Sequence, residues 1–538
     1  MHTLRQDLAF AFRMLAKTPG FTIVAIATLA LGIGANSAIY SVVNAVLFKS
    51  LPYPDAGRLV FINEELPKAK GLAVSWPDYV DWRAQNQVFE KMAAYTNSGV
   101  TFINPGEPKL LPAAWVASPF FSLLGAKTAL GHTFGEADDK PGAKRVAVLS
   151  YRMWRNELKA DPDAIGKEIS LDGALYSIIG VLVPDFDPQG ITSAADVYLP
   201  IGHLSNQLHF VMRANHPGLM VIAKIRAGVP LERTRAELKA IMDRLAKAYP
   251  ESNKDETAVV TPIAERLLGD ARQGLPMLLA AVGAVLLIAC ANVAHLSLAR
   301  ATSREREFAI RAAVGASRSR LIRQLFAESA LLSSLGGAAG LLLAYWSLKP
   351  LIAMYPNSVP GLKEARLDPA VLLSTLGLCV ITAALFGLAP MLRAARAGVN
   401  AGLREGAGFD SGRQARRLRS VLFVAEIAIA VVLTAGAGLL LRSLAAVLEV
   451  NPGFRTDHLL TLDMVRSGRS TPSFFTRVIE RIAALPGVES ASAASGAPLF
   501  GSPWSSPYAP EGQTISNESP WTLINAMMPG YLQAIQAK

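Results

Sequence analysis

The sequence predicts a multi-pass α-helical membrane protein of about five spans, with a large mixed α/β domain outside the membrane. Of its 538 residues, 51% are hydrophobic and only 18% are charged, whereas soluble proteins carry roughly 25% charged residues. Five apolar segments are long enough to cross the roughly 30 Å hydrocarbon layer. One long polar stretch, 49–274, lies between the first two of these segments, and a second, 442–538, follows the last. The composition therefore argues against an ordinary soluble enzyme.

The apolar segments set the order of the expected elements. We expect a cytoplasmic interfacial helix at 1–20, because Leu4, Leu8, Phe12 and Leu15 recur at helical spacing. The remaining elements follow in chain order: first span 21–48, extracytoplasmic domain 49–274, second span 275–299, cytoplasmic loop 300–325, third span 326–348, external loop 349–368, fourth span 369–392, cytoplasmic linker 393–419, fifth span 420–441 and a second external region 442–538.

The distribution of positive charge predicts the orientation. The net charge is +11, and the segments 300–325 and 393–419 carry seven arginines each. Cytoplasmic flanks carry the excess of Lys and Arg, so these segments and the N-terminus are predicted to be cytoplasmic. A basic chain also suits nucleic acid, but the alternation of charge across the spans favours a membrane protein with no nucleic-acid partner. A cleaved signal peptide is the alternative for the first span, although its apolar run continues to Leu47.

The extracytoplasmic domain is predicted to mix helices and strands. Apolar residues share one face of a helix at about 231–249, and the run 176–183 is typical of a strand. A region of this length is large enough for two subdomains.

No motif for covalent chemistry is present in the sequence. It contains no G-x-x-x-x-G-K-[ST], no H-E-x-x-H and no G-x-S-x-G. His203 and His209 are close in sequence but lack a neighbouring carboxylate or Cys at ligand spacing, so we expect them on the surface or in loops. The sequence therefore predicts no catalytic residue, no metal site and no cofactor in this chain.

The segment 290–330 carries a dense pattern of charged residues and glycine. Its pattern comprises Ala299-Arg300, Arg304, Arg306-Glu307, Ala309, Arg311, Gly315-Ala316, Arg323-Gln324 and Glu328-Ser329. In this spacing, residues 275–400 resemble the FtsX-like permease domain. The extracytoplasmic domain is similar to the MacB-like periplasmic core on these residues: Val146-Ala147-Val148-Leu149-Ser150, Trp154, Asp161-Pro162, Ile165-Gly166, Gly180-Val181 and Asp196-Val197-Tyr198-Leu199-Pro200.

The sequence then resembles a second copy of the same arrangement. Residues 416–456 look like another opening span, and 528–535 resembles 118–124 with a one-residue gap. The chain is therefore similar to duplicated MacB-like/FtsX-like ABC transporter permeases of bacteria. Compared with that pattern, we expect it to stop inside the second periplasmic core.

The resemblance implies a permease subunit of an ABC-type system in the bacterial inner membrane, without a nucleotide-binding domain and thus not itself an enzyme. A separate cytoplasmic ATPase would hold ATP and Mg²⁺, and its hydrolysis would move the periplasmic domain for export or efflux. The lipid bilayer, a periplasmic or outer-membrane partner and a second copy of the chain are the other implied partners. Two alternatives stay open: a non-transporting FtsX-like regulatory scaffold for a cell-envelope enzyme, and a truncated inactive remnant.

The resemblance also singles out a coupling loop that would face the ATPase. Its candidate residues are Arg300, Arg304, Arg306, Glu307, Arg311, Gly315, Arg323, Gln324 and Glu328. The alternative is that these arginines only fix the topology by contacting lipid headgroups. That alternative does not explain why Glu307 and Glu328 occupy fixed positions in the pattern.

Two further features lie inside the expected spans. Gly336 and Gly340 form a G-x-x-x-G pattern, which allows close helix approach and predicts a packing face, although it also occurs freely in apolar spans. Glu426 is an intramembrane carboxylate, a functional hypothesis by default. Because it lies near the cytoplasmic end of its span, we expect it to pair with Arg417 or Arg419.

Overall fold

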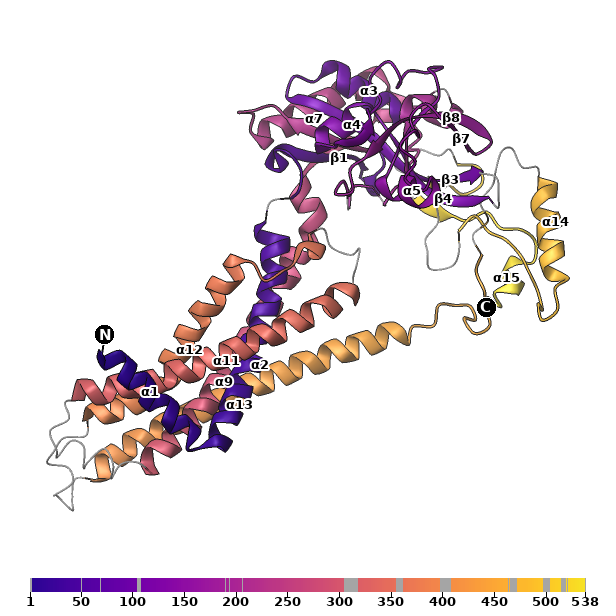
Figure 1. The fold of residues 1–538 in the computed structure, drawn as a ribbon. Helices are drawn as coiled ribbons and strands as arrows, with labels where there is room; N and C mark the ends of the chain where they lie inside the picture. Colours follow the sequence, from indigo (N-terminus) through magenta and orange to yellow (C-terminus); the bar gives the residue numbers. More distant parts are fainter. Residues whose placement is uncertain are drawn as a thin grey trace. The chain divides into compact units, whose positions relative to one another are not determined.

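The computed structural model forms two compact units (Figure 1). The helical unit comprises Met1–Ser50 and Leu268–Glu449, and the sheet unit comprises Leu51–Leu267 and Val450–Lys538. The structure describes residues 2–49, 51–67, 69–103, 108–188, 190–192, 194–205, 207–303, 318–354, 361–396, 408–462, 464, 472–496, 504–513, 519 and 521–537.

The sheet unit is built on one large sheet. Among its described residues, eleven strands form the order β11-β1-β10-β3-β4-β9-β6-β8-β5, with β2 paired to β1 and β7 to β3 and β8. The strands are β1 (Leu59–Leu66), β2 (Ala69–Leu72), β3 (Phe89–Ile103), β4 (Lys109–Val116), β5 (Thr128–Gly131), β6 (Val146–Leu149), β7 (Glu168–Leu171), β8 (Ala174–Leu182), β9 (Val197–Pro200), β10 (Met220–Ile225) and β11 (Thr257–Pro262). Pairs β4–β9 and β6–β8 are parallel, and the other described pairs of this sheet are antiparallel.

Short helices connect or cover these strands (Figure 1). They are η2 (Ala56–Arg58), α3 (Trp76–Gln85), α4 (Pro119–Leu124), α5 (Tyr151–Glu157), η3 (Ile201–His203), α6 (Leu208–Val211), α7 (Leu231–Ala248) and α8 (Pro250–Asn253). The expected helix at 231–249 is confirmed as α7, and the expected strand at 176–183 lies largely in β8.

Two apolar cores stabilise the sheet unit. The larger core joins Trp82 of α3 and Leu238 of α7 to strand residues such as Ile62. The smaller core holds Phe102 and Leu149. Strand β3 contributes to both cores, because its first half packs in the larger one and its second half in the smaller one. The two subdomains that the length allowed are therefore two cores on one continuous sheet.

The helical unit consists mainly of long apolar helices. Its elements are α1 (His2–Ala16), α2 (Pro19–Val43), the π-helical turn η1 (Asn44–Phe48), α9 (Ile263–Ser303, which begins in the sheet unit), α11 (Arg318–Met354), η4 (Leu362–Glu364), α12 (Pro369–Arg396) and α13 (Gly408–Leu448). In the described part of the chain, four segments are long and apolar enough to span a membrane: Pro19–Phe48, Ala271–Ser297, Ile322–Met354 and Phe423–Leu448. A shorter apolar stretch, Pro369–Leu385, lies where the fourth span was expected.

The sheet unit also contains the C-terminal residues. They form α14 (Pro472–Ala483), the antiparallel pair β12 (Trp504–Pro507) and β13 (Trp521–Ile524), and α15 (Tyr531–Ala534). The two segments that resemble each other in sequence each contain a short helix: α4, which begins at Pro119, and α15, which begins two residues after Pro529.

Candidate functional site

Helices α2 and α11 pack closely through glycine. A Cβ atom at Gly336 would lie 2.6 Å from the Cβ of Leu29, and a Cβ atom at Gly340 would lie 3.0 Å from the carbonyl oxygen of Ala30. Both distances are too short for carbon in van der Waals contact. The structure thus places Gly336 and Gly340 against α2, where a larger side chain would push the two helices apart.

Polar side chains bond between helices inside the same unit. The hydroxyls of Ser37 and Thr375 lie 2.8 Å apart and join α2 to α12. The Asn36 Nδ2 donates to the carbonyl oxygen of Val282 at 2.8 Å and joins α2 to α9. Because water is absent from the bilayer core, buried polar groups there need such internal partners. Helix α2 is therefore hydrogen-bonded to both α9 and α12.

Two of the expected coupling arginines contact the N-terminal helix of the chain itself. The Arg323 Nε of α11 lies 2.6 Å from Oδ2 of Asp7, whose side chain is only 5% exposed. The Arg300 Nη2 of α9 donates to the carbonyl oxygen of Met14 at 2.9 Å, and its guanidinium lies 5.0 Å from the ring centre of Phe21. Helix α1 is therefore joined to the ends of α9 and α11 by charge and hydrogen bonding.

The other coupling candidates lie either within α11 or outside the described residues. Gln324 and Glu328 lie in α11 and are half-buried. Arg304, Arg306, Glu307, Arg311 and Gly315 lie outside the described residues. Sequence reasoning did not identify Asp7 or Met14 as partners, because they lie far from Arg323 and Arg300 along the chain and no local pattern links them.

Beyond the C-terminal end of α2, another polar contact joins η1 to the start of α12. The Asp368 Oδ2, at the start of α12, accepts a hydrogen bond from Asn44 Nδ2 at 2.9 Å and lies 3.1 Å from Lys49 Nζ. Its Oδ1 accepts from the backbone N–H of Val371 at 3.1 Å and so caps α12. Burial acts against ionisation, but these hydrogen bonds outweigh it and lower the pKa of Asp368.

The intramembrane carboxylate lies near a histidine of another helix. Oε2 of Glu426 in α13 lies 3.6 Å from Nδ1 of His295 in α9. The side chains of Arg417 and Arg419 lie outside the described residues. Sequence reasoning treated the histidines as scattered and did not pair His295 with a carboxylate.

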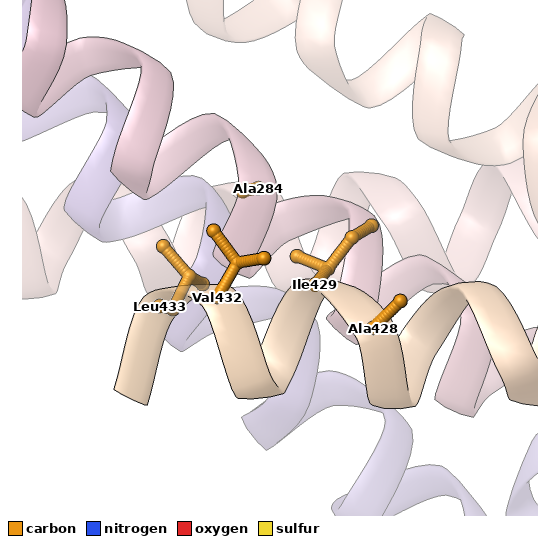
Figure 2. Close-up of a pocket in the computed structure, with 5 residues that line it drawn as sticks. All are labelled: Ala284, Ala428, Ile429, Val432 and Leu433. Carbon is orange, nitrogen blue, oxygen red and sulfur yellow. The ribbon is translucent and has the colours of Figure 1, made fainter. Parts of the chain in front are cut away.

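An apolar hollow lies between the same two helices, α9 and α13. Its volume is about 300 Å³, and Figure 2 shows it between α9 and α13, lined by Ala284, Ala428, Ile429, Val432 and Leu433. These side chains are aliphatic and carry no hydrogen-bonding groups. The hollow therefore suits hydrocarbon rather than a polar substrate.

Comparison with known families agrees with both units. Residues 22–241 match the MacB-like periplasmic core domain, and residues 279–399 match the FtsX-like permease C-terminal domain. The first match covers α2 and most of the large sheet, and the second covers most of α9 together with α11 and α12.

Curated relatives are export proteins. The chain is 27% identical over 282 residues to the pyoverdine export ATP-binding/permease protein PvdT of Pseudomonas syringae pv. tomato, covering 52% of this chain and 40% of that protein. It is 26% identical over 231 residues to the macrolide export ATP-binding/permease protein MacB of Burkholderia pseudomallei, covering 43% and 34%. The matches therefore span less than half the length of these relatives.

The chain also matches the solved structure of the periplasmic region of MacB from Actinobacillus actinomycetemcomitans. The match covers 43% of this chain and 96% of that chain, with a TM-score of 0.31 and 12% identity.

Apolar helices of membrane-spanning length and the two matched domains define a membrane transport permease. The sheet unit includes its periplasmic domain, and the chain is an inner-membrane protein. The chain carries a MacB-like periplasmic core domain and an FtsX-like permease domain, and the relatives it resembles are bacterial ABC export permeases.

Proposed function

We propose that this chain couples ATP hydrolysis by a separate cytoplasmic ATPase to movement of its periplasmic domain, and that the movement drives export. The N-terminus and the segments 300–325 and 393–419 face the cytoplasm in this proposal, because positive charge accumulates there. ATP and Mg²⁺ are assigned to the ATPase, since these 538 residues contain no P-loop motif. Both relatives are named as export ATP-binding/permease proteins, which supports ATP-driven transport as the function and export as its direction.

The contacts of α1 carry this proposal. Asp7 is paired with Arg323, and Met14 with Arg300. Arg300 and Arg323 come from the two helices that flank residues 304–317. A displacement of that segment by a bound ATPase would therefore act on α9, α11 and α1 together.

The continuity of α9 supplies a route from this segment toward the periplasmic domain. Helix α9 begins at Ile263, directly after β11, and the Ile263 side chain is 1% exposed in the larger core of the sheet unit. The same helix continues to Ser303 and includes Arg300. Pro276 lies inside α9 and cannot donate the usual backbone hydrogen bond, which makes it the expected point of bending.

Co-purification tests the proposal. The full chain, carrying a tag, is extracted gently from native membranes, and the masses and ATPase activity of the recovered proteins are measured. We expect an ATP-binding subunit and ATP hydrolysis in the same fraction, both missing from a mock purification of untagged membranes. Recovery of the chain alone, without ATPase activity, would contradict the proposal.

The mode of action needs a second measurement on the same complex. Stimulation of ATP hydrolysis by an exported compound, with accumulation of that compound inside inverted membrane vesicles, supports export. Retention of a cell-envelope hydrolase, with no compound moved, would instead favour the regulatory scaffold.

A further inference from the structure

Three ionisable side chains meet at one end of the large sheet in the periplasmic domain. Nε2 of His216 lies 3.0 Å from Oε2 of Glu64 and 2.8 Å from Oε1 of Glu256. The Glu64 side chain is fully buried, and those of Glu256 and His216 are 2% and 11% exposed. We call these three residues the Glu–His–Glu cluster.

The sheet register brings the cluster together. Glu64 lies in β1, which pairs antiparallel with both β10 and β11. His216 lies shortly before β10, and Glu256 directly precedes β11. Three segments distant in sequence therefore each contribute one group to the same place.

Hydrogen bonding alone leaves this cluster incompletely satisfied. A histidine Nε2 carries at most one hydrogen, so His216 cannot donate a linear hydrogen bond to both carboxylates through Nε2. Oε2 of Glu64 also accepts from the backbone N–H of Ser75 at 3.0 Å. The other oxygen, Oε1, is buried and has no hydrogen-bond partner among the described residues. A buried carboxylate oxygen without a partner is costly, so the cluster offers an unfilled ligand position.

The nearby arginine is already engaged elsewhere. Arg213 pairs with Asp78 and Asp81, and Asp78 also accepts a hydrogen bond from Asn253. His216 is the basic group that faces both carboxylates of the cluster, so a metal ion at this site would take the place of the proton on its Nε2.

The spacing of the three ligand atoms suits a metal ion. They all lie within 4.8 Å of one another. Ligands bound at about 2.0–2.1 Å and at right angles are about 3.0 Å apart, and tetrahedral ligands are about 3.3 Å apart. The two histidine–carboxylate distances are close to these values. Small side-chain shifts would complete the coordination.

We propose that Glu64, His216 and Glu256 bind one divalent transition-metal ion of the zinc class. Imidazole nitrogen with carboxylate oxygen is a donor set that Zn²⁺ accepts. The ion joins β1 to the segments that precede β10 and β11. Because α9 follows β11 directly, the ion stabilises the part of the sheet from which that helix leaves.

Zinc binding by the full chain tests this site. The protein is purified in detergent with a tag that contains no histidine, treated with a chelator, dialysed and titrated with zinc chloride. We expect one Zn²⁺ per chain by elemental analysis and a rise in the unfolding temperature on adding zinc. Glu64→Gln, His216→Gln and Glu256→Gln should each weaken zinc binding at least about tenfold. The exposed controls His132→Gln and Glu251→Gln should bind zinc like the parent.

A spectroscopic measurement on the unaltered chain keeps the proposal testable if a buried variant fails to fold. X-ray absorption of the zinc-loaded protein should show an oxygen and nitrogen shell with one imidazole. Absence of stoichiometric zinc, zinc without imidazole, or unchanged affinity in the three folded variants would overturn the site. In that case a proton shared by the two carboxylates and His216 accounts for the cluster.

Discussion

Gly34 of α2 and Gly340 of α11 lie in direct backbone contact. A Cβ atom at Gly340 would be 2.9 Å from the backbone nitrogen of Gly34, and one at Gly34 would be 2.8 Å from the carbonyl oxygen of Gly340. Small residues permit this approach, on which helix packing in membranes depends. The contact holds together the two helices that carry the N-terminal and central spans.

Gly340→Ala should therefore lower the stability of the helical unit. The added methyl meets backbone rather than a movable side chain, so we expect a loss of about 1–3 kcal/mol. The matched control is Gly377→Ala in α12, where a Cβ meets nothing within 4 Å. Unfolding of both variants in detergent micelles measures the difference, and equal stability would contradict tight α2–α11 packing.

Reversing the charge of Arg323 should weaken coupling to the ATPase. Arg323→Glu places a carboxylate beside the buried Asp7, and like charges repel. We expect reduced ATPase activity of the co-purified complex and faster proteolysis of α1. The double variant Asp7→Arg with Arg323→Glu should recover both, because it restores an opposite-charge pair.

Arg13→Glu is the control for that experiment. It makes the same Arg-to-Glu change, but on α1, where the Arg13 side chain donates only within its own helix among the interactions that the structure describes. A double variant as impaired as Arg323→Glu would show that the pair itself does not matter. If Arg323→Glu changes the proteolysis of α1 but leaves ATPase activity unchanged, the contact with Asp7 exists but has no role in coupling.

The contribution of Asp368 to stability should depend on pH. Hydrogen bonds from the Val371 N–H and Lys49, which outweigh burial, lower its pKa, so its ionised form stabilises the folded state. This stabilisation is complete above the ordinary aspartate pKa of about 3.9 and is lost as the pH falls through the lower folded-state value. The stability difference between the parent and Asp368→Asn should therefore shrink on acidification below about pH 4. A difference independent of pH would contradict this explanation.

Removing Arg213 should destabilise the sheet unit strongly. Asp78 is fully buried and pairs with Arg213, which also stacks 4.0 Å from the ring centre of Tyr249. Arg213→Met leaves that carboxylate without its cation, at an expected cost of about 3–5 kcal/mol. Lys239→Met removes the exposed pair with Asp243 and should cost about 1 kcal/mol or less. Chemical unfolding followed by tryptophan fluorescence compares the two variants, and similar losses would disprove the distinction.

Much of the architecture follows from patterns that are local in the sequence. The uncharged run in α2 is sufficient to predict a span, because transfer of apolar side chains into hydrocarbon depends on composition and length. The apolar face of α7 is equally predictable from the sequence, since residues such as Leu238 and Met242 recur with the helical period. The Gly336-x-x-x-Gly340 pattern likewise predicts a packing face on its helix, although it does not identify the partner helix.

Contacts between distant residues were not predictable in the same way. Glu426 was expected to pair with an arginine near its own span, whereas its described neighbour is His295 from another helix. Asp7 contributed only a charge to the sequence pattern, yet it lies beside Arg323. Helix packing selects these partners, and the sequence contains no short-range signal for it.

By itself, the sequence determined the membrane class, the approximate number of spans and the arginine-rich segments, because hydropathy and charge act residue by residue. Only the tertiary structure decided that Glu64, His216 and Glu256 meet, since their meeting depends on the register of β1 with β10 and β11. It likewise decided that Arg300 and Arg323 contact α1. Such sites arise when burial of apolar surface fixes distant strands and helices against one another, and the polar groups carried with them must then find partners.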